Sequence, residues 1–264
     1  MPKCRVGSDE IYYETLGAGT PLLLVPGLGG AGTYWNPNRD GLSKNHLVVI
    51  HDHRGTGQST HARIRYSVDQ MADDMLAVMD DLKLEKAHLV GHSTGGAIVQ
   101  TAAARWPDRL KSIVIYGSWT KADPFFDRTF EARRTLLMAG GLEAYVRSNP
   151  IFLYPDWWLN ANIASLEQRE KVILANSPPA EIIASRIDAI LAFDRTADLP
   201  KVTTPTLVLC AKDDILTPPY FSRELARLIP GAELVEMEKG GHFVSEVDAD
   251  GFNKVVLDFI GRHE

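Results

Sequence analysis

The stretch LVGHSTGGA, from Leu89 to Ala97, places one serine, Ser93, between Gly91 and Gly95 directly after an apolar run. It matches the G-x-S-x-G nucleophile elbow, in which a strand turns sharply into a helix and the serine side chain stands on the turn. The sequence supplies that context, because AHLVG (87–91) is predicted as a buried strand and TGGAIVQTAAARW (94–106) as a helix. Small neighbours leave room at such a strained turn. We therefore expect Ser93 to be a nucleophile.

Short apolar runs alternate with longer amphipathic ones along the rest of the chain. Strands are predicted at 10–15, 21–27, 46–52, 87–91, 110–117, 204–214 and 232–238, and helices at 67–82, 94–106, 220–229 and 249–263. This alternation favours an α/β fold, with a mostly parallel sheet and helices on both faces.

The alternation stops between residues 119 and 196, where glycines and prolines divide several helical pieces. The dividing residues are Gly140-Gly141, Pro150, Pro155 and Pro178-Pro179. We expect a helical cap at 119–196, inserted into an α/β core formed by 1–118 and 197–264.

The charge composition disfavours polyanionic partners. The 28 basic and 34 acidic residues give a formal charge of −6, which does not favour binding to nucleic acid or to an anionic membrane. The two cysteines, Cys4 and Cys210, lie in strand-like runs and are expected to be buried thiols. We expect a cytoplasmic enzyme with a small-molecule substrate, no metal and no cofactor. The oligomeric state is open, with a homodimer as one alternative.

A serine hydroxyl needs a base, and with this type of elbow the acid and then the histidine follow the serine along the chain. After Ser93 the sequence has only His242 and the penultimate His263. His242 follows the predicted strand 232–238 and two glycines, so a flexible loop can carry it over the sheet edge. The acid is expected after the strand in LVLCAKDDILTPP, where Asp213 and Asp214 are both candidates.

Two backbone N–H groups are expected to face the oxyanion of the reaction. One is that of Thr94, directly after the nucleophile. The other is that of Leu28, in the glycine-rich loop PGLGGAG (26–32). This loop lacks the Lys and Ser/Thr of the G-x-x-x-x-G-K-[ST] pattern of phosphate-binding loops, and we expect no nucleotide cofactor.

Together these segments resemble the α/β-hydrolase superfamily over essentially the whole chain. The matching segments are PGLGG, DHRGTGQS (52–59), GHSTGG, KDDILTPP and GGH. The resemblance implies the α/β-hydrolase fold, with eight strands and the cap over the catalytic edge. It also implies that Asp214, four residues before Pro218, is the acid, and that Arg54-Gly55-Thr56-Gly57 is a structural turn.

A closer resemblance is to the pyrimidine-utilisation hydrolases of the RutD type. It is carried by GLGGAGTYW (27–35), HRGTG (53–57) and, within the cap, NPIFLYPDWW (149–158). It implies cleavage of aminoacrylate or a related carbamate. The elbow of that family does not always keep a serine, and its presence here supports an acyl-enzyme route.

Aromatic side chains near the elbow and in the cap are candidates for a substrate pocket. Those expected to line it are Tyr34, Trp35, His92, Trp119, Phe152 and Trp157. Arg128, Arg133 and Arg134 share one predicted helix, and any that points inward would favour a substrate carboxylate.

The leading hypothesis is a serine hydrolase that cleaves a small ester, lactone, carbamate or activated amide through an acyl-enzyme. One alternative is hydrolysis of a carbon–carbon bond in a vinylogous diketone. Another is a non-catalytic ligand receptor on the same fold, because a fold does not fix a function.

Overall fold

The structure, a computed structural model, describes residues 2–264 and contains a single eight-stranded sheet in the order β1-β2-β4-β3-β5-β6-β7-β8. The strands are β1 (Lys3–Val6), β2 (Asp9–Leu16), β3 (Thr20–Val25), β4 (His46–His51), β5 (Ala87–His92), β6 (Leu110–Tyr116), β7 (Thr206–Ala211) and β8 (Glu233–Met237). β2 pairs antiparallel with β1 and β4, and the other neighbours are parallel. The predicted mostly parallel sheet is confirmed.

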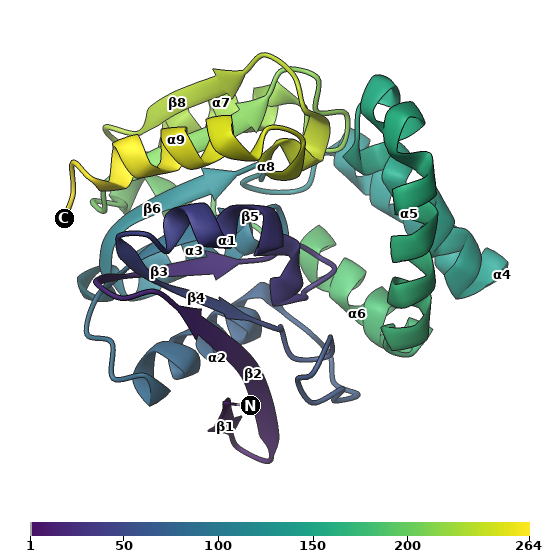
Figure 1. Ribbon diagram of the computed structural model, residues 1–264, viewed down its shortest axis with the longest axis horizontal. Helices are drawn as coiled ribbons and strands as arrows, with labels where there is room; N and C mark the ends of the chain where they lie inside the picture. Colours follow the sequence, from purple (N-terminus) through teal and green to yellow (C-terminus); the bar gives the residue numbers. More distant parts are fainter. Residues whose placement is uncertain (1) are drawn as a thin grey trace.

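Helices cover both faces of this sheet (Figure 1). They are α1 (Asn36–Leu42), α2 (Val68–Asp81), α3 (Thr94–Arg105), α7 (Pro219–Leu228), α8 (Val244–Val247) and α9 (Ala249–Ile260). Successive strand residues point to opposite faces. In β3, Leu23 therefore packs in the core beneath α2, α3 and α7, whereas Leu22 packs in the core beneath α1 and α9.

Three helices, α4 (Pro124–Leu153), α5 (Asp156–Asn176) and α6 (Ala180–Leu191), lie between β6 and β7 in the chain. Figure 1 shows them together at the end of the sheet toward which β6 runs. This is the helical insertion expected from the sequence. It covers the edge at which the carboxyl ends of the parallel strands meet, where ligand sites collect in α/β sheets.

Three local features differ from the sequence prediction. Pro150 does not divide the cap helix, since α4 continues to Leu153 and breaks its helical geometry at Gly141, where φ is 81°. Glycine tolerates that positive φ without steric cost. The short helices α1 and α8 were not predicted, because seven and four residues carry too little hydrophobic periodicity.

Both cysteines are free and buried, as predicted. Burial raises the pKa of each thiol to about 11, so neither is a reactive thiolate at neutral pH. Within residues 2–264, no helix combines the length and hydropathy needed to cross a membrane.

Buried histidines make the stability of the fold sensitive to acid. Burial lowers the pKa of His51 and of His88 to about 4. The unfolded chain takes up these protons below about pH 6.5, whereas the folded chain does not until about pH 4. The free energy of unfolding is therefore expected to fall between these values by up to about 1.4 kcal/mol per pH unit for each histidine.

Urea unfolding between pH 7 and about pH 4.5 measures this effect. His51 is the residue to replace, because neither of its buried ring nitrogens has a hydrogen-bond partner among the described residues. His51→Leu is expected to reduce the fall of the free energy of unfolding with decreasing pH by the amount due to one proton. The control, His61→Leu at an exposed position, is expected to leave that fall unchanged. Equal slopes for His51→Leu and the unmodified protein would contradict the assignment.

Candidate active site

Ser93 occupies the turn between β5 and α3 with φ 54° and ψ −114°. A non-glycine residue in such a conformation costs on the order of 1–3 kcal/mol and is held only by its surroundings. Here the Ser93 N–H donates to the Tyr116 carbonyl at 2.8 Å, and Ser118 Oγ donates to the Ser93 carbonyl at 2.9 Å. The strained conformation is thus fixed by hydrogen bonds from the neighbouring strand, β6, and the residues after it.

The glycines of the elbow are required by the close approach of α3 to the sheet. A Cβ on Gly91 would lie 2.2 Å from the Gly95 carbonyl oxygen, and a Cβ on Gly95 would lie 2.1 Å from that of Val25. Any side chain at either position would push the helix away from the strands. The two glycines therefore bring the N-terminus of α3 under Ser93.

His242 lies in a one-turn helix, Gly241–Phe243, after β8, and it pairs with Asp214 from the loop after β7. His242 Nδ1 is 2.8 Å from Asp214 Oδ2, and both side chains are almost fully buried. The other carboxylate oxygen of Asp214 accepts the N–H groups of Leu216 and Thr217 at 2.8 and 2.9 Å. A hydrogen bond from Nδ1 to a carboxylate leaves a lone pair on Nε2.

Asp213, the other acid that the sequence offered, does not contact the histidine ring. Its Oδ1 accepts the N–H groups of Gly240 and Gly241 at 2.9 and 2.8 Å. Asp213 therefore holds the backbone of the loop that carries His242, while Asp214 holds its imidazole.

The serine and histidine segments are joined through shared neighbours. The carbonyl of His242 accepts from Tyr116 Oη at 2.5 Å and lies 3.1 Å from His92 Nε2. Tyr116 also accepts the Ser93 N–H through its own carbonyl. Over residues 2–264, no hydrogen bond links Ser93 to His242, and His242 Nε2 is buried without a partner. The expected contact between the serine oxygen and the imidazole stays a prediction.

The predicted oxyanion donors lie on the two segments that flank Ser93. Thr94 is the first residue of α3. On the other side, a Cβ on Gly27 would lie 3.2 Å from Ser93 Cβ, so the loop of Leu28 touches the elbow. The N–H of Gly30 donates to the Gly27 carbonyl at 3.0 Å, which closes a tight turn with Leu28 inside it. The role of these N–H groups stays a prediction.

A cavity of about 560 Å³ opens beside His242, between the loops that carry the histidine and the acids and the α4–α5 junction of the cap. Its lining is mostly apolar, as is usual for small-molecule sites. The lining residues are Ile151, Phe152, Leu153, Tyr154, Pro155, Asp156, Trp157, Leu159, Asn160, Asp213, Ile215, Gly241 and His242. Phe152 and Trp157 are therefore placed at a cavity next to the candidate base.

Trp35 and Trp119, which were expected to line a substrate pocket, are not among the residues that line this cavity. Both are fully buried, Trp35 against Phe252 and Trp119 against Phe126. Large flat rings fill interior space efficiently, and periodicity alone does not separate such a role from a pocket wall. The other two aromatic candidates are Tyr34 and His92, whose rings stack with centroids 4.6 Å apart. Tyr34 contacts Phe243, and His92 contacts the His242 carbonyl.

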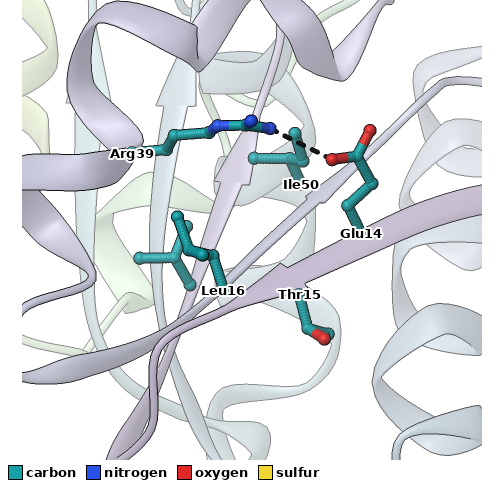
Figure 2. Close-up of a pocket in the computed structure, with 6 residues that line it drawn as sticks. Glu14, Thr15, Leu16, Arg39 and Ile50 are labelled. Carbon is teal, nitrogen blue, oxygen red and sulfur yellow. Dashed lines mark hydrogen bonds and ion pairs between the residues drawn. The ribbon is translucent and has the colours of Figure 1, made fainter.

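A second hollow of about 60 Å³ lies along β2 and β4 and shares no lining residue with the cavity beside His242 (Figure 2). An ion pair of 3.0 Å between Arg39 and Glu14 spans it, as the dashed line in Figure 2 marks. A space of this size holds a few water molecules at most. We therefore place the candidate active site at the elbow.

Comparison with known proteins agrees with this fold. Residues 20–249 match the alpha/beta hydrolase fold family. The chain is 42% identical over 262 residues to a protein of Azorhizobium caulinodans named "Putative carbamate hydrolase RutD", with 99% of both chains covered. The protein of that name from Caulobacter vibrioides strain NA1000 is 40% identical over 266 residues, which cover 98% of this chain and 99% of that one.

Solved structures are similar over the full length as well. The enol-lactonase from Burkholderia xenovorans LB400 has a TM-score of 0.90 at 28% identity, with 98% of this chain and 100% of that chain covered. A thermophilic esterase from Thermogutta terrifontis has a TM-score of 0.88 at 24% identity, with 100% and 99% covered, which is a likeness of fold. The chain thus belongs to the α/β-hydrolase fold family, and its full-length relatives include proteins named "Putative carbamate hydrolase RutD".

Proposed function

We propose that this hydrolase cleaves a small acyl compound through an acyl-enzyme on Ser93, with His242 as base and Asp214 as the acid that orients it. The observation that carries the proposal is the buried His242–Asp214 pair, whose Nε2 is unpaired within the described chain and whose segment shares Tyr116 as a hydrogen-bond partner with the strained elbow serine. In a structure without substrate, catalytic hydrogen bonds are often long or absent and form in the substrate complex.

The proposed reaction follows from the open lone pair on His242. Nε2 takes the proton of Ser93 Oγ while that oxygen attacks the substrate carbonyl carbon. The N–H groups of Leu28 and Thr94 stabilise the tetrahedral oxyanion. The imidazolium, stabilised by Asp214, then protonates the leaving group, and water repeats the sequence on the acyl-enzyme.

For the substrate, the relatives named RutD support a carbamate. The resemblance to that family adds an aminoacrylate-like compound, which carries a carboxylate. The similarity to an enol-lactonase supports the broader class of esters and lactones. Two alternatives remain in the test: a vinylogous diketone cleaved at a carbon–carbon bond, and a receptor that binds without turnover.

A buried arginine in the cap supports a substrate with a negative charge. Of Arg128, Arg133 and Arg134, which lie within two turns of α4, only Arg133 is buried, at 4% exposure. Its Nη2 donates to Asn149 Oδ1 at 2.9 Å, but its buried Nε has no partner and no described acidic side chain pairs with it. Arg134, by contrast, is half exposed and paired with Asp188. A buried cation without a counter-ion is costly, and a bound carboxylate would neutralise it.

Arg133→Gln is therefore expected to raise KM for an acyl substrate with a free carboxylate by about 10- to 100-fold, because a charged hydrogen bond is worth roughly 1.5–3 kcal/mol. KM for the neutral methyl ester of the same substrate is expected to change less than about threefold. Arg134→Gln is the matched control on the same helix. An equal rise in KM for the charged and neutral substrates would remove Arg133 as a carboxylate partner.

A substrate screen with purified protein tests the proposed function itself. It includes aryl esters, lactones, carbamates, aminoacrylate and a vinylogous diketone, with Ser93→Ala as the control. Turnover of an acyl compound that depends on Ser93 supports the proposal. Turnover of the diketone alone supports the second enzyme, and ligand-dependent thermal shifts without turnover support the receptor.

A further inference from the structure

Arg186, from cap helix α6, is buried at 1% exposure and reaches out of the cap to the loops of the sheet. Its Nη2 donates to the Leu28 carbonyl at 2.9 Å and its Nε to the same oxygen at 3.3 Å. Nη1 donates to the Arg54 carbonyl at 3.0 Å, and Nη2 is also 3.0 Å from His53 Nδ1. No acidic side chain in the described chain forms an ion pair with it.

These partners are neutral acceptors, and the arginine remains charged. Burial lowers the pKa of Arg186 to about 10, so the guanidinium is protonated at neutral pH. Burial also lowers the pKa of His53 well below its ordinary value, which keeps that imidazole neutral and able to accept. A full positive charge is thus held against two backbone carbonyls, an arrangement that gives strong, charge-assisted hydrogen bonds.

The Leu28 carbonyl belongs to the central peptide of a turn, and Arg186 supplies the only hydrogen bonds to it among the described residues. It lies inside the turn closed by the hydrogen bond from Gly30 N–H to the Gly27 carbonyl, and Gly29 and Gly30 follow it. Rotation of the central peptide of such a turn exchanges the sides on which its carbonyl and N–H point, and glycine lowers the steric cost. Two donors of one rigid guanidinium fix the carbonyl on the cap side.

The approach of the arginine depends on the absence of a side chain in the loop. A Cβ on Gly30 would lie 2.9 Å from Arg186 Nη2 and 2.6 Å from Thr56 Oγ1. The same loop contacts the elbow, because a Cβ on Gly27 would lie 3.2 Å from Ser93 Cβ. Arg186 therefore contacts the residue that directly follows Gly27, and Gly27 itself lies against Ser93.

We propose that Arg186 is a positioning residue, which holds the Leu28–Gly29 peptide from the cap and so fixes the conformation of the turn that carries the Leu28 N–H, the oxyanion donor expected from this loop. The inference rests on the proposed function, since it assigns a task to the loop only if an oxyanion forms there. If Arg186 has this role, the activity of the enzyme depends on the packing of α6 against the loop of Leu28. Arg186 itself contacts no reacting atom.

The effect expected of a positioning residue is a loss of kcat with little change in KM, because the oxyanion exists only in the transition state. Arg186→Lys and Arg186→Gln are expected to lower kcat for an aryl ester by about 10- to 100-fold, somewhat less than the loss of a whole oxyanion donor. KM is expected to stay within about threefold, and the inhibition constant of a boronic acid that forms a tetrahedral adduct to rise by the same factor as kcat falls.

The matched control is Arg134→Gln, an exposed arginine of the cap, which is expected to leave kcat and the boronic acid affinity unchanged. A purely structural role for Arg186 would lower thermal stability and the active fraction without changing kcat per active site or the boronic acid affinity. That result, or a rise in KM alone, overturns the inference. A wild-type chain that hydrolyses no acyl substrate overturns the proposed function, and this inference with it.

A second change keeps the test decisive if the Arg186 variants do not fold. Replacing Gly29 by glycolate converts the peptide after Leu28 into an ester, whose carbonyl is a weaker acceptor, and leaves Arg186 in place. The same fall in kcat at unchanged KM is expected. An unchanged kcat in this variant overturns the proposed task of the Leu28 carbonyl.

Discussion

Replacing Ser93 with alanine is expected to lower kcat for an activated aryl ester by at least about 10⁴-fold, since removal of a triad nucleophile leaves only oxyanion stabilisation and binding. The fold is expected to persist, because Ser93 makes its structural hydrogen bonds through its backbone N–H and carbonyl. Alanine keeps both groups and removes only Oγ. Steady-state kinetics with titrated protein measures the loss.

Ser112→Ala is the control for this variant. Ser112 is a fully buried serine on β6, bonded to His88 and away from the elbow, so its loss is expected to lower stability without lowering kcat. If Ser93→Ala retained more than about a hundredth of wild-type kcat, the proposed route through an acyl-serine would be excluded.

The second large effect is expected for Asp214→Asn, which should lower kcat by about 10³- to 10⁴-fold, the loss known for this change in serine proteases. The surroundings of the carboxylate fix the outcome. Oδ1 receives the N–H groups of Leu216 and Thr217, so the amide oxygen of the variant takes that position. The amide NH₂ then faces His242 Nδ1 and imposes the tautomer that carries its proton on Nε2. That imidazole cannot accept the Ser93 proton.

Asp213→Asn gives a matched control one residue away. Its Oδ1 accepts two backbone N–H groups and does not contact the imidazole, and an asparagine oxygen serves equally as that acceptor. We expect kcat to fall by less than about tenfold. A larger loss for Asp213→Asn than for Asp214→Asn would contradict the assignment of the acid.

Much of the fold could be predicted because local and global signals agree. The apolar run before Ser93 has strand length and is buried on both faces as β5, and the glycines that follow are required by the contact of α3 with the sheet. The order of serine, acids and histidine along the chain located the loops that meet at the carboxyl edge. The residues alone did not decide which of the two adjacent aspartates pairs with His242. The structure does, since Asp214 contacts the imidazole and Asp213 contacts the backbone of the loop.

The packing of individual side chains and hydrogen bonds between distant parts of the chain could not be predicted from the sequence. Trp35 and Trp119 have the same pattern whether they face a pocket or the core, and only the structure shows them packed against Phe252 and Phe126. The burial of Arg133 depends on how α4 packs against α6. Arg186 gave no signal, because its partners are backbone carbonyls 132 and 158 residues earlier in the chain, and a backbone carbonyl has no sequence signature.

The most direct test is mass spectrometry of the intact protein during the burst phase with a slowly deacylating aryl ester. The account predicts one acyl group per chain, located on Ser93 by peptide mapping. The rate at which this adduct forms is expected to equal the rate of the product burst and to fall sharply in Asp214→Asn. Full-rate hydrolysis without a covalent adduct, or an acyl group on any other residue, would contradict it.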